Sequence, residues 1–237
     1  MILIDNGSHD KVNTIFARYE AGSGFGLRSG VFGKQEGKVL GDFVRAPPQA
    51  ESVMYFEKAG IENTDVTLKV AFNHAAAKGI KDVIVASTTG YTAEKILEIP
   101  AREAFRIVVV THNTGFKEEG LQSFPVDLRQ RLTGEGISVH TGTMVLRSLG
   151  TAIRDLSGGY SEQELVANTL RMFSQGVKVC VEISAMAADA GLVPFADVMA
   201  IAGTGRGADT ACVIRANSSN RFFKIKVKEF ITKPKET

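Results

Sequence analysis

The sequence has few cysteines, little net charge and no long apolar run, and each of these shortages excludes a class of protein. Its two cysteines, Cys180 and Cys212, lie in apolar segments, and neither a CxxC spacing nor a cluster of histidines accompanies them. We interpret both as reduced core thiols, so the sequence predicts neither a disulfide framework nor a metal site of the zinc type. The net charge of +2 is too small to indicate a nucleic-acid partner.

Membrane and secretory signals are also missing. No uncharged run approaches the length that crosses a bilayer, and the first residues, MILIDNGSHD, lack a basic region followed by an apolar core. We therefore expect a cytoplasmic protein without a membrane partner. The hydrophobic content of 44% and charged content of 23% suit a globular chain with one substantial core.

Residues 1–53 differ in character from the remainder of the chain. Glycine recurs through them, and their short apolar pieces sustain neither helical nor strand periodicity. The string GSGFGLRSGVFG has the composition of a nucleotide loop, but it lacks the preceding strand and following helix that such a loop needs. We expect a glycine-rich N-terminal extension over 1–53, whose order the sequence leaves open, and a folded domain over 54–237.

The folded domain alternates buried strands with helices. A helical pattern over 64–78 precedes the first buried strand, and further helical patterns separate the later ones. This alternation predicts an α/β domain with a doubly wound, mostly parallel sheet. Ligands bind such sheets at the carboxyl ends of the strands. The expected strands lie at 83–85, 106–111, 137–141, 198–203 and 222–232.

The first strand leads into the main candidate site, a small hydroxyl-rich loop. Within DVIVASTTGYTAEKIL, the loop offers hydroxyls, backbone N–H groups and a helix start, all of which suit a phosphate. The alternative is that Thr92 is only an N-cap and Gly90 only a turn residue. The candidate residues of this loop are Ser87, Thr88, Thr89, Gly90, Tyr91 and Thr92.

Two further polar loops, at 111–116 and 140–143, also follow strands, so we expect all three loops at one edge of the sheet. A glycine-rich segment follows the strand at 198–203. The string 203–208 satisfies G-x-G-x-x-A, but residues 210–216 are strand-like, which argues against a dinucleotide site. What remains is a glycine-rich concavity with an arginine, suited to an anion, or simply a tight connection between two strands. The candidate residues are His112, Asn113, Gly115 and Phe116 in the loop at 111–116 and Gly203, Thr204, Gly205, Arg206, Gly207 and Asp209 in the glycine-rich segment.

The segment VKVCVEISAMAADAGLV begins with strand-like alternation and ends with a helical composition. We predict a single helix, which places Lys178, Glu182 and Asp189 on one face. A polar line of this kind is typical of a solvent-exposed face; the alternative is that it reaches the site.

Five motifs in order give the chain from Met54 onward a resemblance to a known group. They are YFEKAGIENT, VASTTGYTA, VTHNTGFKEEG, TLRMFSQGVKVCVEI and GTGRGADTA. The chain resembles uncharacterised proteins related to the C-terminal domain of pyruvate kinase. The resemblance implies a three-layer α/β/α fold with a mixed five-stranded sheet whose last strand is antiparallel.

The resemblance also carries expectations about function. In pyruvate kinase this domain is separate from the catalytic barrel, and its Thr/Ser/Gly loop receives the phosphate of a sugar bisphosphate regulator; residues 87–92 here occupy that place. Because the barrel and a metal-binding carboxylate set are missing, we do not expect pyruvate kinase activity. The resemblance further implies bound flavin mononucleotide (FMN), with its phosphate on this loop, its remainder toward the loop at 111–116 and the glycine-rich segment, and Phe116 or Tyr91 beside its ring.

Two alternatives remain open at this point. The first is a regulatory module that senses a metabolite phosphate without catalysis and signals to a partner subunit, in a homo-oligomer for example. The second is a hydrolase or transferase with His112 as general base and Asp209 or Glu182 as its partner. No metal site is expected in any of the three cases.

Overall fold

The structure is a computed structural model that describes residues 52–236. Apart from Ser52 and Val53, the predicted extension over 1–53 lies outside the described residues. The folded domain expected from residue 54 onward is described up to residue 236.

The domain is built on one mixed sheet of seven strands in the order β1-β7-β6-β5-β2-β3-β4. The strands β5, β2, β3 and β4 run parallel to one another, β6 is antiparallel to both of its neighbours, and β1 is parallel to β7. The predicted mixed, mostly parallel sheet is confirmed, with seven strands where the resemblance implied five. The bounds are β1 (Met54–Lys58), β2 (Asp82–Ala86), β3 (Arg106–Val110), β4 (Ser138–His140), β5 (Asp197–Ala202), β6 (Thr210–Arg215) and β7 (Lys226–Glu236).

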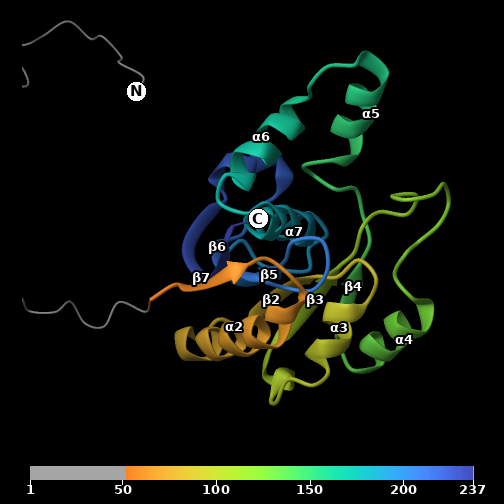
Figure 1. Ribbon diagram of the computed structural model, residues 1–237. Coiled ribbons are helices and arrows are strands. Elements are labelled where there is room, and N and C mark those ends of the chain that lie inside the picture. Colours follow the sequence, from red (N-terminus) through yellow and green to blue (C-terminus); the bar gives the residue numbers. More distant parts are fainter. Residues whose placement is uncertain (1–51, 237) are drawn as a thin grey trace, which may run out of the picture. The chain divides into compact units, whose positions relative to one another are not determined.

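Helices cover both faces of this sheet, which gives the predicted three layers (Figure 1). Alternate side chains of β2 serve the two faces: Val83 and Val85 pack with α2, α3 and α4, whereas Ile84 packs with α7. These central strands are therefore apolar on both sides, as parallel strands in α/β proteins are. The helices are α2 (Thr64–Lys78), α3 (Tyr91–Ile96), α4 (Val126–Gly134), α5 (Ser148–Ser157), α6 (Glu162–Arg171) and α7 (Gln175–Asp189).

The helix α7 lies unusually close to the sheet. It is one helix, as predicted, and almost every residue between Gly176 and Ala188 is buried. A Cβ atom at Gly176 would lie 2.1 Å from Oγ1 of Thr210 on β6, so only glycine permits this approach. The close contact fixes the position of the first turn of α7, which carries residues of the site.

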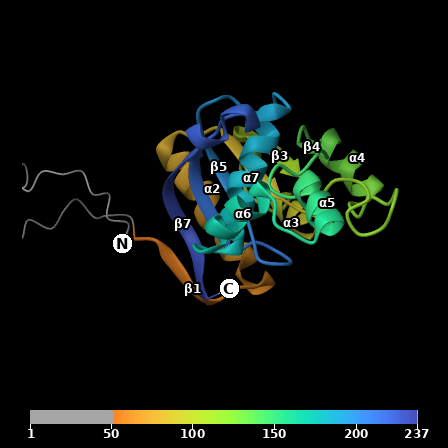
Figure 2. The ribbon, with the colours of Figure 1, turned by 90° about the horizontal axis from the view of Figure 1, so that it is seen from above.

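The two ends of the described chain meet at one side of the sheet. The register pairs Met54 of β1 with Thr232 of β7 and Lys58 with Glu236, and Figure 2 shows these strands side by side. The prediction of an edge strand over 222–232 was therefore partly wrong. Residues 219–224 form a 3₁₀ helix, and β1 covers the second half of β7. No helix within residues 52–236 has the length and apolar character needed to cross a membrane.

Candidate functional site

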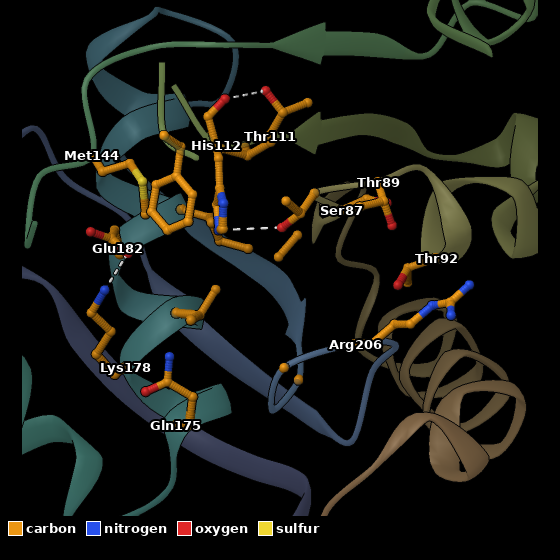
Figure 3. Close-up of a pocket in the computed structure, with 18 of the residues that line it drawn as sticks. Ser87, Thr89, Thr92, Thr111, His112, Met144, Gln175, Lys178, Glu182 and Arg206 are labelled. Atoms are coloured by element: carbon orange, nitrogen blue, oxygen red, sulfur yellow. Dashed lines mark hydrogen bonds and ion pairs between the residues drawn. The ribbon is translucent and has the colours of Figure 1, made fainter. Parts of the chain in front are cut away.

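A cavity of about 730 Å³ lies at the carboxyl ends of β2, β3 and β5. The register places these ends together, because Ala86 pairs with Val110 and Val85 pairs with Ile201. The loops after β2 and β3 meet at this edge as predicted, together with the glycine-rich loop after β5, whereas the third predicted loop, residues 140–143, is not part of the cavity lining. The helix α7 forms the facing wall (Figure 3).

The loop after β2 supplies hydroxyl groups to the cavity. Ser87 anchors it: its N–H donates to the carbonyl of Val110 at 3.0 Å, and its Oγ accepts from the N–H of Ala93 at 3.2 Å. Thr88, Thr89 and Thr92 line the cavity with Ser87. The loop is therefore held by the hydroxyl of Ser87, and the hydroxyl of Thr88 lies against Nε2 of His112.

The alternative role predicted for Thr92 was wrong in detail. The N-cap of α3 is Gly90, with φ at 97°, and the side chain that accepts a first-turn N–H of this helix is that of Ser87. A Cβ atom at Gly90 would lie 2.5 Å from Cδ2 of Leu128, so glycine is required by both the backbone angle and the packing. Thr92 is buried within the first turn of α3 and lines the cavity.

The loop after β3 contributes two rings that contact each other, and Arg147, just before α5, lies over one of them. The rings of His112 and Phe116 lie 3.8 Å apart between centroids, and the guanidinium of Arg147 lies 4.6 Å from the centre of the Phe116 ring. Burial, with the positive charges of Arg147, Lys178 and Lys117, lowers the pKa of His112 to about 4. The imidazole is therefore neutral at neutral pH.

The predicted pairing of His112 with a carboxylate is not formed. Nε2 of His112 lies 3.2 Å from Oγ1 of Thr88, and its buried Nδ1 has no partner within residues 52–236. Asp209 is fully buried elsewhere, where its Oδ2 accepts the N–H groups of Thr204 at 3.1 Å and Gly60 at 3.3 Å. The arrangement expected for a hydrolase or transferase, a histidine base oriented by an acid, is thus absent from the described site.

The glycine-rich segment forms the tight connection between β5 and β6, and it also lines the cavity. Gly207 has φ at 78°, and a Cβ atom there would lie 2.5 Å from Oγ1 of Thr64. The same hydroxyl accepts the N–H of Ala208 at 3.0 Å, which fixes the end of the loop. Arg206 extends from the loop with its guanidinium 5.3 Å from the centre of the Tyr91 ring.

The structure divides the predicted site residues into two groups. Most of them line the cavity: Ser87, Thr88, Thr89, Tyr91, Thr92, His112, Phe116, Gly203, Gly205, Arg206 and Gly207. The others shape or anchor the loops without reaching the cavity lining: Gly90, Asn113, Gly115, Thr204 and Asp209.

The wall contributed by α7 was missed as part of the main prediction. Lys178 and Glu182 are 2% and 1% exposed, and Nζ of Lys178 donates to Oε2 of Glu182 at 2.5 Å. The other carboxylate oxygen, Oε1, accepts the N–H of Leu146 at 2.8 Å. The interpretation of Lys178 and Glu182 as part of a solvent-exposed face was wrong, and the alternative that they reach the site is the one the structure supports. The sequence pattern that indicated this alternative was two charges, four residues apart, on a helix otherwise rich in apolar residues.

Positive charge prevails in the cavity. Burial is the main cause that lowers the pKa of Lys178, and the Glu182 carboxylate opposes it. The described residues that line the cavity include one carboxylate, that of Glu182, which is engaged by Lys178 and Leu146. The cationic side chains of the lining are Lys117, Arg147, Arg171, Lys178 and Arg206. Residues 52–236 contain no group of three or more side chains suited to hold a metal ion.

Comparisons with known proteins give a solved structure and a family as matches. A crystal structure of a pyruvate kinase from Cryptosporidium parvum matches 68% of this chain and 24% of its own, with 13% sequence identity and a TM-score of 0.35. The chain thus spans about a quarter of the length of that enzyme. Residues 65–214, well over half of the chain, match the family described as pyruvate kinase, alpha/beta domain. The chain therefore belongs to the family of pyruvate kinase alpha/beta domains.

Proposed function

We propose that this protein binds a phosphorylated small molecule in the cavity at the carboxyl ends of its strands, with FMN as the first candidate. The observation that carries the proposal is the charge of the cavity. Several cationic side chains meet there, and its single carboxylate is already neutralised by Lys178. A partly enclosed site of this charge favours an anionic ligand over a neutral one.

The phosphate belongs at the hydroxyl-rich loop. Thr88, Thr89 and Thr92 present hydroxyl donors there, and Arg206 lies on the same side of the cavity in Figure 3. Arg206 forms no salt bridge with any residue of the described chain, so its guanidinium is available to the ligand. Arginine binds phosphate oxygens with paired N–H donors, and such charge-assisted bonds are about twice as strong as neutral ones.

The remaining lining suits the larger part of FMN. The volume of about 730 Å³ lies within the range of cofactor sites, roughly 300–1,000 Å³. Phe116, Met144, Ile183 and Met186 provide apolar and aromatic surface of the kind that packs on a flat ring. When bound, FMN supplies redox chemistry, while the protein supplies position and charge.

We do not assign pyruvate kinase activity to this chain. The family match is to the alpha/beta domain, and the described residues offer no group of side chains suited to hold a metal ion. The free and buried thiols of Cys180 and Cys212 agree with our proposal of a cytoplasmic location.

A sensing module is the second candidate, and the state of His112 favours it over a hydrolase or transferase. With its pKa lowered to about 4 and a threonine hydroxyl as its partner, His112 is poorly suited to act as a base near pH 7. The same cavity would then bind a metabolite phosphate and signal, in a homo-oligomer for example, without chemistry.

The first experiment is the visible absorption spectrum of the purified protein, with mass spectrometry of any compound that a denaturant releases. A flavin spectrum and the mass of FMN are the expected result. If the protein is colourless, FMN is added back and binding is measured. Stabilisation by sugar phosphates without FMN binding favours the sensing module, and no stabilisation by any phosphorylated compound contradicts the proposal.

A pair of variants locates the phosphate. Thr89→Glu places a negative charge at an exposed position of the hydroxyl loop, and we expect it to weaken FMN binding at least tenfold without unfolding the domain. Thr169→Glu makes the same change at an exposed position of α6 outside the cavity lining, so it serves as the control. Equal affinities of the two variants would contradict the placement of the phosphate.

A further inference from the structure

The buried ammonium of Lys178 has hydrogen-bond capacity that the described chain does not use. A lysine ammonium carries three N–H donors. Within residues 52–236, the acceptor of Nζ is Oε2 of Glu182, and no second acceptor lies within hydrogen-bond distance. Because Lys178 is 2% exposed, the remaining donors cannot be fully hydrated, and leaving them unpaired costs free energy. They belong to a cavity wall, so a bound molecule can satisfy them.

Gln175 offers a second unused donor beside Lys178. Its Oε1 accepts Nε of Arg171 at 2.7 Å, which fixes the orientation of the amide and leaves Nε2 as the free end. Nε2 has no acceptor among the described residues. Gln175 and Lys178 are three residues apart on α7, so they share a face of the helix. Figure 3 shows both on the wall opposite Thr89, Thr92 and Arg206.

We propose that Gln175 and Lys178 form a second recognition site, which binds a neutral, acceptor-rich edge of the ligand at the end farthest from its phosphate. This inference rests on the proposed function, and it narrows the ligand to phosphorylated molecules that carry a planar group with neighbouring carbonyl or ring-nitrogen acceptors. The pyrimidine edge of the FMN ring has this chemistry.

The position of Glu182 makes Lys178 itself a poor site for a phosphate. Its carboxylate contacts Nζ of Lys178, so the pair is neutral overall and a phosphate placed on Lys178 would also meet a negative charge. No carboxylate pairs with Arg206 within the described residues. Arg206 thus has no carboxylate beside it, whereas Lys178 does, so we place the phosphate at Arg206 and the uncharged acceptors at Lys178 and Gln175. Arg147 and Arg171 add positive charge on the Lys178 side of the cavity.

The test compares FMN with riboflavin, which differs only by lacking the phosphate, in three variants. Lys178→Met/Glu182→Gln removes the donors of Lys178 and leaves no buried charge, because both charged groups are replaced. The glutamine can still accept the N–H of Leu146. We expect this double variant to weaken both ligands by the same factor of at least ten. Arg206→Met should weaken FMN alone. Lys69→Met removes an exposed charge of α2 outside the cavity lining and should leave the binding of both ligands unchanged.

The outcomes separate the inference from the proposed function. If the Lys178→Met/Glu182→Gln variant weakens FMN alone, or neither ligand, the second recognition site is refuted and the phosphate proposal stands. If the unaltered protein binds FMN no better than riboflavin, the proposed function fails. If it binds neither, both fail. Should the double variant not fold, Gln175→Met at a partly exposed position should show the same pattern with a smaller factor, and unchanged affinities in it refute the inference.

Discussion

The single substitution Lys178→Met should be among the most destabilising changes at the cavity. It leaves the carboxylate of Glu182, which is 1% exposed, without its cationic partner. Removing one member of a buried ion pair costs about 3–5 kcal/mol of unfolding free energy, because the other charge stays desolvated. For a domain of this size that corresponds to a fall in Tm of roughly 6–20 °C.

The double variant Lys178→Met/Glu182→Gln separates this cause from a loss of packing. It removes both charges, keeps an acceptor for the N–H of Leu146 and nearly preserves both side-chain volumes. We expect its unfolding free energy to lie within about 1–2 kcal/mol of the original protein. The assay is reversible guanidinium unfolding at pH 7, read by circular dichroism. If Lys178→Met costs less than about 1 kcal/mol, or if the double variant is no more stable than the single one, the reasoning from an uncompensated buried charge is refuted.

Three further predictions concern pH and glycine. Burial lowers the pKa of His112 from 6.5 to about 4, so the unfolded chain binds a proton more readily than the folded one. The unfolding free energy should therefore fall as the pH drops from 6.5 to 4. The variant His112→Gln should show a smaller fall over the same pH range. Gly207→Ala and Gly205→Ala both place alanine at positive φ, but of these two positions only Gly207 has neighbouring atoms that a Cβ atom would meet. We therefore expect Gly207→Ala to be less stable than Gly205→Ala by about 1–3 kcal/mol in chemical denaturation. Equal stabilities of the two variants would contradict the steric argument. Gly176→Ala drives a Cβ atom against Thr210, and we expect thermal unfolding to show a loss of roughly 1–3 kcal/mol in spite of the better helix propensity of alanine.

Local patterns in the sequence determined much of this protein. The β-branched runs at 83–85 and 106–110 formed central strands, because side chains buried on both faces of a sheet must be apolar along the whole strand. The loops that follow β2, β3 and β5 met at one edge, because parallel strands align their carboxyl ends. The residues of the hydroxyl loop and Arg206 were identified for this reason.

Only the tertiary structure decided the rest. The strand β1 has mostly exposed side chains and depends on backbone pairing with β7, so its sequence has no alternation of apolar and polar residues that would predict a strand. The i,i+4 spacing of Lys178 and Glu182 showed that they share a face of α7, but not which face. The absence of a side chain at Gly176 lets that helix approach Thr210, and the resulting packing turned two charged residues into the buried wall of a cavity.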